Sequence, residues 1–379
     1  MELDLDDSTR QFQQEVRDFL TANVPADPLP SMDTEAGFEA HREWERTLAQ
    51  ARLSVVSWPE EFGGRDASLL EWVLFEQEYY AAGAPGRVSQ NGIFLLAPTL
   101  FEHGTPEQLA RIMPRMARGD DIWAQAWSEP EAGSDLAGIR STARRTDGGW
   151  LLSGQKTWSS RASFADRAFG LFRSDPEAER HRGLTYLMFP LTADGVTVRP
   201  IPQLDGEPGF AEIFLDDVFV PDEDVIGAPD DGWRVAMSTS SNERGLSLRS
   251  PGRFSATARR LIDLWRDTGD AGAASRDAVV DAWIGSEAYR LHTLGTVTRL
   301  NEGGKLGAES SITKVFWSEL DIAMHETALE LLGADAEQAG RWTDGYLFSL
   351  SGPIYAGTNE IQRNIIAERL LGLPRGGGR

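Results

Sequence analysis

The carboxyl end of the chain carries residues whose types and spacing could do chemistry. Residues 354–363 read Ile-Tyr-Ala-Gly-Thr-Asn-Glu-Ile-Gln-Arg, which combines a glycine turn with a Thr-Asn pair typical of a helix N-cap. A helix that begins there points free backbone N–H groups and the positive end of its dipole at the turn. This arrangement suits an electron-rich or anionic group such as a phosphate. Because such caps are common, other segments must support the interpretation.

Two other segments carry matching signals. Residues 127–135 read Trp-Ser-Glu-Pro-Glu-Ala-Gly-Ser-Asp, and residues 154–160 read Gly-Gln-Lys-Thr-Trp-Ser-Ser. Together with the carboxyl-terminal segment, they resemble the acyl-CoA dehydrogenase family, and the resemblance runs from about Ser8 to Pro374. The resemblance implies a bound FAD and a reaction that removes hydrogen from Cα and Cβ of an acyl-CoA thioester, giving a trans-2-enoyl-CoA in lipid metabolism.

The resemblance also implies which residues contact the cofactor. The matching positions are Gln125, Trp127, Ser128, Trp158, Ser160, Gly333, Thr358 and Glu360. An indole at position 158 would stack on the flavin, and a hydroxyl at position 160 would reach N5. A carboxylate would repel phosphate, so we expect Glu360 to act through its backbone or a ribose hydroxyl. Gly333 matches a glycine that approaches a neighbouring subunit's cofactor.

The family's Arg-x-x-Phe-Gly segment, which reaches FAD across a subunit interface, is not recognisable in this chain. Residues 299–307 instead read Arg-Leu-Asn-Glu-Gly-Gly-Lys-Leu-Gly. The contacts on the adenine side of the cofactor are therefore left undefined.

Position 356 decides where the catalytic base must come from. Many family members carry their catalytic Glu there, but this chain has Ala356. Removing the weakly acidic α-proton requires a carboxylate whose pKa is raised by burial. Some members take that Glu from a helix of the C-terminal bundle, and the resemblance assigns this role to Glu243. The alternative is a solvent-facing Glu paired with Arg244.

Three further positions are expected at the substrate. The resemblance places Ser134 beside the pantetheine, and it places Arg244 and Tyr355 in the substrate site. The backbone N–H of Ala356 would donate to the thioester carbonyl and stabilise the developing enolate, as in an oxyanion hole.

Composition limits the class of protein. The formal net charge of −22 argues against nucleic acids and anionic membranes as partners. CoA is itself polyanionic, so arginines must gather locally. Arg244, Arg249 and Arg253 on one predicted helix could serve, or could simply neutralise an acidic surface. The chain has no Cys, and none of its five His form a metal-type pair, which argues against a zinc or haem enzyme. Without an apolar run of about 18 residues or a leader segment, we expect a cytoplasmic protein.

The periodicity of the chain predicts an α+β multidomain protein. Helical patterns before residue 121, including one over Gly92–His103, and after residue 232 flank a region of strands and turns. The strands predicted in this region are Trp150–Leu152, Arg167–Arg173, Gly183–Pro190, Val196–Ile201 and Phe210–Val220. The predicted domains are an N-terminal helical domain (1–121), a middle β domain (122–231), a C-terminal helical domain (232–373) and a mobile tail (374–379). The resemblance makes these a helical domain, a β-barrel-like domain and a four-helix bundle. Within the last of these, residues 232–268 read as one long helix.

The leading hypothesis is an acyl-CoA dehydrogenase that passes electrons to an electron-transfer flavoprotein and assembles as a homodimer or homotetramer. The same scaffold also resembles acyl-CoA oxidases, nitroalkane oxidases and flavin monooxygenases, and carrier-protein thioesters are alternative substrates. A different class is a non-catalytic subunit that completes a neighbour's FAD site in a mixed tetramer. The missing Glu at 356 motivates that last alternative.

Overall fold

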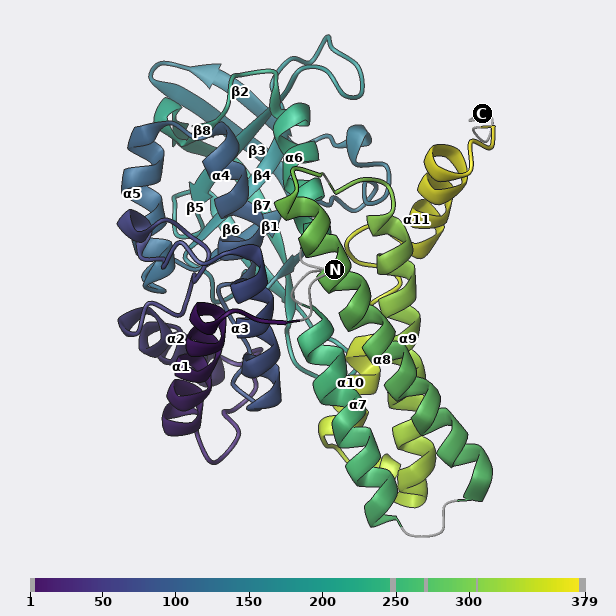
Figure 1. Ribbon diagram of the computed structural model, residues 1–379. Helices are drawn as coiled ribbons and strands as arrows, with labels where there is room; N and C mark the ends of the chain where they lie inside the picture. Colours follow the sequence, from purple (N-terminus) through teal and green to yellow (C-terminus); the bar gives the residue numbers. More distant parts are fainter. Residues whose placement is uncertain (1–3, 246–249, 269–271, 305, 375–379) are drawn as a thin grey trace. The chain divides into compact units, whose positions relative to one another are not determined.

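The computed structural model describes residues 4–245, 250–268, 272–304 and 306–374, apart from the side chains of residues 241–250, 273 and 274. The chain forms two compact units (Figure 1). One unit comprises residues 25–66 and 85–243, and the other comprises residues 1–24, 67–84 and 244–379. Each unit has its own apolar core.

An eight-stranded sheet forms the centre of the first unit, and its strands follow the order β6-β7-β3-β2-β4-β5-β8, with β1 pairing β4 in parallel. The strands are β1 (Trp123–Ala126), β2 (Thr142–Thr146), β3 (Gly149–Ser160), β4 (Arg167–Arg173), β5 (Leu184–Pro190), β6 (Val196–Ile201), β7 (Phe210–Pro221) and β8 (Val225–Ile226). Alternation along β7 buries Ala211, Ile213 and Leu215 in the sheet's core, as the period of two requires. Two exposed residues, Asp216 and Asp217, then shift the alternation by one, so that Val218 is the next buried residue.

The helices of the first unit are α2 (Glu35–Gln50), α4 (Ala97–His103), α5 (Pro106–Ala117) and α6 (Gly232–Gly245). Helix α5 begins at a capping box, in which the side chains and backbone N–H groups of Thr105 and Gln108 bond reciprocally, with Pro106 at the first helical position. Residues Asn91–Leu96 form a π-helix that leads into α4. Such π segments are rare and often lie at functional sites.

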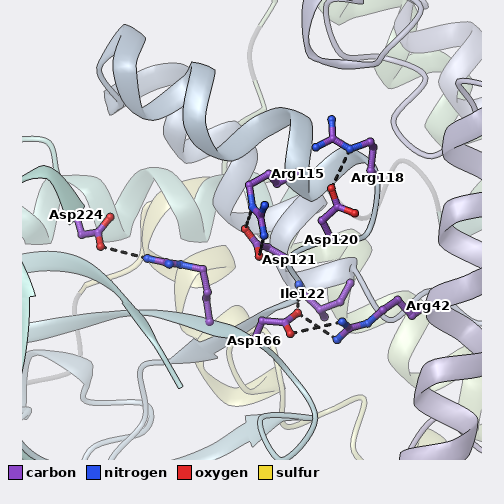
Figure 2. A network of polar contacts seen from close by, with 9 residues as sticks. Arg42, Arg115, Arg118, Asp120, Asp121, Ile122, Asp166 and Asp224 are labelled. Atoms are coloured by element: carbon purple, nitrogen blue, oxygen red, sulfur yellow. Dashed lines mark hydrogen bonds and ion pairs between the residues drawn. The ribbon is translucent and has the colours of Figure 1, made fainter. Parts of the chain in front are cut away.

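A network of ion pairs fixes the start of β1 (Figure 2). The Asp166 carboxylate accepts the Ile122 N–H at 2.7 Å and pairs with Arg42 of α2 at 3.1 Å. Arg115 of α5 donates twice to Asp121. Burial acts to raise the pKa of Asp121, but the hydrogen bonds and charge of Arg115 outweigh it and lower that pKa. The network anchors the strand that leads to the segment 125–128.

The second unit is helical. Its helices are α1 (Asp7–Asn23), α3 (Leu69–Ala81), α7 (Ser250–Asp267), α8 (Gly272–Asn301), α9 (Ser310–Leu332), α10 (Arg341–Ser349) and α11 (Asn359–Ile365). Helices α7, α8 and α9 lie side by side (Figure 1) and bury an aromatic core that includes Phe254, Tyr289 and Trp317. Helix α1 buries Phe12, Val16 and Leu20 on one face, spaced as an amphipathic helix requires.

Within the range 232–268 predicted as one helix, the structure describes α6 and α7, and residues 246–249 between them lie outside the described residues. Of the three arginines expected on that helix, Arg244 lies in the last turn of α6, Arg253 belongs to α7, and Arg249 lies outside the described residues. Strand β3 is also longer than the predicted Trp150–Leu152, because a bulge at Gly154 lets the strand continue to Ser160. A Cβ at Gly154 would lie 2.7 Å from the Cα of Ser141, so only glycine fits there.

Within the described residues, no group of three or more His, Asp or Glu side chains is arranged to hold a metal ion. Over the same residues, none of the helices combines the length and the apolar character that crossing a membrane requires.

Candidate active site

In the first unit, the structure brings together two of the predicted cofactor segments. The backbone N–H of Thr157 donates to the carbonyl of Ser128 at 2.9 Å, so the end of β3 lies against the segment that follows β1. Trp127 and Ser128 are thereby held next to the strand that carries Trp158 and Ser160.

A buried ion pair holds these two segments in place. The Lys156 ammonium, fully buried, donates to Glu129 Oε1 and to the Leu171 carbonyl, each at 2.8 Å. Glu129 also accepts the N–H groups of Arg140 and Ser141. Burial lowers the pKa of Lys156, and the charge of Glu129 opposes that shift. Burial likewise acts to raise the pKa of Glu129, but Lys156 and the hydrogen bonds lower it overall.

Trp158 has the features of a wall for a planar ring. Its residue adopts φ +58°, uncommon outside glycine, at the point where the register between β3 and β7 shifts. The indole is 59% exposed and packs edge-on against Phe210. Beside it, the hydroxyls of Ser128 and Ser160 make no hydrogen bond to the described part of the chain. An exposed aromatic face with free hydroxyls nearby fits an isoalloxazine ring, which needs both stacking and donors.

Two predicted positions lie nearby in sequence. Gln125 is half-buried in β1, and its backbone pairs with Phe169 of β4. Ser134 is exposed in the turn that follows Glu129, so its hydroxyl is open to a ligand.

In the helical unit, the carboxyl-terminal turn is built around Ala356. This residue adopts φ +55°, and Gly357 follows with φ +80°. The Gln362 side chain, itself buried, donates to the Ala356 carbonyl at 3.1 Å and holds the turn from within. No described residue accepts a hydrogen bond from the Ala356 N–H. That N–H is consequently available to an acceptor outside the chain.

Helix α11 begins directly after this turn. The Thr358 hydroxyl accepts the N–H of Ile361 at 3.2 Å, which confirms the predicted N-cap. A hydrogen bond from its own backbone N–H, followed by one from the Thr358 hydroxyl, lowers the pKa of Glu360, an exposed carboxyl in the first helical turn. A buried trio secures the helix, because Lys314 Nζ donates to Asn359 Oδ1 at 2.8 Å while Ser318 bonds the same amide.

In the helical unit, Tyr355 lies next to a buried ion pair between Arg253 and Asp321. Its ring packs against Trp317 and Phe348. Burial of its hydroxyl raises the pKa of Tyr355, although 38% of the residue is exposed, and the neighbouring charge of Arg253 opposes the shift. Arg253 in turn pairs at 2.5 Å with Asp321, of which only 1% is exposed. Arg253 is thus part of the frame behind the turn and not a free surface cation.

Gly333 lies apart from this turn. It caps α9 with φ +57°, and a Cβ there would meet nothing within 4 Å. Helix α11 packs on α9 near Ser318. At the rise per residue of an α-helix, Gly333 at the end of α9 lies about 20 Å from Ser318. Gly333 therefore belongs to a different surface of the unit than Thr358 does.

The predicted base and its neighbour fall at the edge of what the structure describes. Glu243 and Arg244 are in the last turn of α6, and their side chains lie outside the described part. Their assigned roles stay predictions, as do the other site assignments and the domain boundaries.

Sequence reasoning missed the supporting residues. Lys156 sits in a strand where a charge would be expected to face water, and Glu129 reads as an ordinary loop acid. Tyr186 and Gln362 have no local signal, because each acts through a contact distant in sequence or across a turn. Arg253 was named only for its charge, and its buried partner Asp321 could not be predicted.

The chain matches all three domain models of one family. The acyl-CoA dehydrogenase N-terminal domain matches residues 6–120, the middle domain matches residues 124–218, and the C-terminal domain matches residues 230–371. The fold class expected from the sequence, a helical domain, a β domain and a second helical domain, is confirmed.

Individual proteins are similar over nearly the whole chain. The acyl-CoA dehydrogenase IpdE1 of Mycolicibacterium smegmatis is 39% identical over 390 residues, covering 97% of this chain and 98% of that protein. IpdE1 of Mycobacterium tuberculosis is 39% identical over 381 residues, covering 96% and 98%.

Among solved structures, the Tcur3481-Tcur3483 steroid ACAD superimposes with a TM-score of 0.89 at 26% identity, covering 99% of this chain and all of that one. The ChsE4-ChsE5 complex of Mycobacterium tuberculosis gives a TM-score of 0.84 at 28% identity, again covering 99% of this chain. These matches span both the fold and the segments described above, and this chain therefore belongs to the acyl-CoA dehydrogenase family of FAD-dependent oxidoreductases.

Proposed function

We propose that the protein converts an acyl-CoA thioester into its trans-2-enoyl-CoA, with Glu243 as the base. The observation that supports this proposal most directly is the turn at Ala356. Its side chain has no proton acceptor, yet its N–H is free of partners among the described residues and its conformation is fixed by Gln362. A turn of this kind suits a thioester carbonyl, while the base must come from elsewhere in the chain.

Each residue then has a distinct task. The Ala356 N–H donates to the thioester oxygen and stabilises negative charge that develops there. Glu243 removes the α-proton from the carbon made acidic by that contact. Trp158 excludes water from one face of the cofactor ring, and the hydroxyls of Ser128 and Ser160 donate to its polar edge. When bound, FAD supplies the two-electron acceptor for the hydride that leaves Cβ.

The test is the variant Glu243→Gln, assayed by anaerobic stopped-flow bleaching of the flavin. FAD should remain bound, and the rate of flavin reduction should fall at least 10²- to 10⁴-fold, the range that general base catalysis provides. Glu131→Gln, at an exposed carboxylate, serves as the control and should leave the rate unchanged. A Glu243→Gln enzyme that reduces its flavin at a near-normal rate would show that the base is another group.

For the substrate, we propose a steroid-derived or similarly bulky acyl-CoA. The similarity to a structure named as a steroid ACAD supports this class. The small side chain of Ala356 also leaves room beside the thioester. An anaerobic bleaching screen across straight, branched, cyclic and steroid side-chain acyl-CoA esters tests it, and preference for a straight medium chain would exclude it. The same screen with carrier-protein thioesters tests whether the acyl group is bound to a carrier protein and not to CoA.

For the assembly, we propose at least a dimer, in which a second chain completes the FAD site. Two observations support it: Gly333 lies about 20 Å along α9 from the Thr358 turn, and similar structures are named as two-component complexes. A second copy of this chain and a homologous partner chain are both candidates. A light-scattering mass near 41.7 kDa for the flavin-loaded protein would exclude both.

For the electron acceptor, we propose an electron-transfer flavoprotein in the cytoplasm. The oxidase alternative predicts stoichiometric hydrogen peroxide from an acyl-CoA in air, and a dehydrogenase should form little. The non-catalytic alternative predicts a protein that, when purified alone, either lacks the yellow colour of bound FAD or does not bleach with any acyl-CoA under anaerobic conditions.

A further inference from the structure

A chain of buried hydrogen bonds runs through the first unit from the cofactor segment to helix α6. The Trp127 indole N–H donates to the hydroxyl of Tyr186 in β5 at 3.0 Å. That hydroxyl lies 3.3 Å from Thr239 Oγ1 in α6, which lies 2.8 Å from Thr99 Oγ1 in α4. Tyr186, Thr239 and Thr99 are all fully buried.

The donor and acceptor properties of these groups determine which atom donates in each hydrogen bond of the series. An indole N–H only donates, so Tyr186 must accept from Trp127 and has one proton left to give. The adjacent acceptor for that proton is Thr239. Thr239 then donates onward, either to the Val235 carbonyl at 3.1 Å or to Thr99. Removing any member takes one hydrogen-bond partner away from a buried polar group.

Helix α6 is fixed to β5 at a second point. Its first residue, Gly232, lies so close to the strand that a Cβ would come within 2.7 Å of the Tyr186 backbone N. The Thr239 contact is the next anchor, two turns further along the helix. Position 243 follows one turn after Thr239 in the same continuous helix.

We propose that Tyr186 and Thr239 are positioning residues that couple the Trp127 segment at the flavin to the helix that carries the base. The inference rests on the proposed function, in which Trp127 lies beside the isoalloxazine and Glu243 accepts the α-proton. Through this link, the two reacting elements keep a fixed mutual arrangement, because a shift of either one breaks a buried hydrogen bond. Neither residue is itself required to touch substrate or cofactor.

The test compares Tyr186→Phe, Thr239→Val and the double variant. Thr239→Ser keeps the hydroxyl and should rescue. Thr327→Val is the matched control, because Thr327 is a buried helical threonine whose hydroxyl bonds the carbonyl four residues earlier, at Ala323. Two quantities are measured in each: amide hydrogen exchange of α6 residues 232–240, with and without FAD, and the rate of flavin reduction at saturating acyl-CoA.

Each single variant should retain FAD, speed exchange in α6 by about 10-fold, and slow flavin reduction by about 10-fold with KM nearly unchanged. The double variant should be no worse than the poorer single one, because both substitutions break the same link. Thr239→Ser and Thr327→Val should match the unmodified protein within about twofold.

Additive losses in the double variant would overturn the proposal, as would exchange and reduction rates equal to those of Thr327→Val. The exchange readout is independent of which residue is the base. If Glu243→Gln kept full activity while Tyr186→Phe still loosened α6, the proposed function would fail, and the structural link would stand without its role in catalysis.

Discussion

Replacing Glu129 by Gln should destabilise the sheet-containing unit strongly, because it leaves the Lys156 ammonium in the interior without a counter-charge. Lys156 is fully buried, and Glu129 is 7% exposed. Breaking a buried ion pair by removing one partner costs about 3–5 kcal/mol. An amide also has only one oxygen, whereas the carboxylate uses both, for Lys156 on one and the Arg140 N–H on the other.

For a unit of roughly 200 residues, that free energy corresponds to a fall in melting temperature of about 6–20 °C. Thermal unfolding of the FAD-loaded protein, followed by calorimetry, measures it. The control is Glu131→Gln, whose carboxylate pairs with Arg140 at 2.9 Å, nearly the 2.8 Å of the buried pair, but in full exposure. Exposed pairs contribute about 0–1 kcal/mol, so this variant should melt within about 4 °C of the parent.

The burial of Lys156 also predicts how the stability of Glu129→Gln depends on pH. Burial already lowers the pKa of Lys156 below its ordinary value of 10.5, and Glu129 opposes that shift. Without Glu129 the folded-state pKa falls further, so the unfolded chain binds more protons than the folded one between that value and 10.5. Stability of Glu129→Gln should therefore rise with pH across this window, relative to the parent. A loss below about 1 kcal/mol, or a loss that does not shrink toward pH 10, would refute the account of the buried pair.

Other substitutions test the second unit and the helix caps. Arg253→Met removes the guanidinium from the buried Asp321, which then keeps, among the described residues, only an ion-pair contact with His325 at 3.3 Å, and should cost about 3–5 kcal/mol in urea unfolding; a cost under 1 kcal/mol would contradict the burial argument. Gln362→Met removes the donor to the Ala356 carbonyl and should lower kcat/KM for flavin reduction about 10-fold while FAD stays bound; unchanged kinetics would show that the turn holds itself. Thr105→Ala removes the α5 cap and should cost about 1 kcal/mol by thermal melting, with no change in flavin reduction; an unchanged melting temperature would argue against the capping box.

Helices and strands could be predicted where their own residues carry a clear periodic pattern. The amphipathic helices and the strands Arg167–Arg173 and Val196–Ile201 follow from periodicity, and the structure has them at the predicted bounds. Strands β1 and β2 were missed, since both are short, β1 contains two Ala that favour strands weakly, and β2 is rich in Arg and Thr. The π-helix before α4 was expected as ordinary helix, because one extra residue in a turn leaves no mark in composition.

The site divides in the same way. Trp158 and Thr358 could be named from motifs, and the structure gives each a local conformation that fits, a left-handed bulge and an N-cap. The residues that hold them could not be named, because Lys156 and Tyr186 matter only through partners elsewhere in the fold. Sequence motifs therefore identify the residues expected at the ligand, whereas the residues that hold them in place are identified only by their burial and contacts in the folded structure.

The left-handed backbone at Ala356 has a consequence for how this enzyme could change over evolutionary time. The turn already carries a non-glycine residue at φ +55°, held by Gln362 whatever the side chain is. An unbranched Glu would fit the same backbone, and some alanine codons differ from a glutamate codon by a single nucleotide. One mutation could thus introduce a carboxylate at the turn without rebuilding the loop. With Glu243 as the proposed base, a lineage could then carry both acids for a time and later lose either one, so that the reaction survives while its proton acceptor moves from helix α6 to this turn.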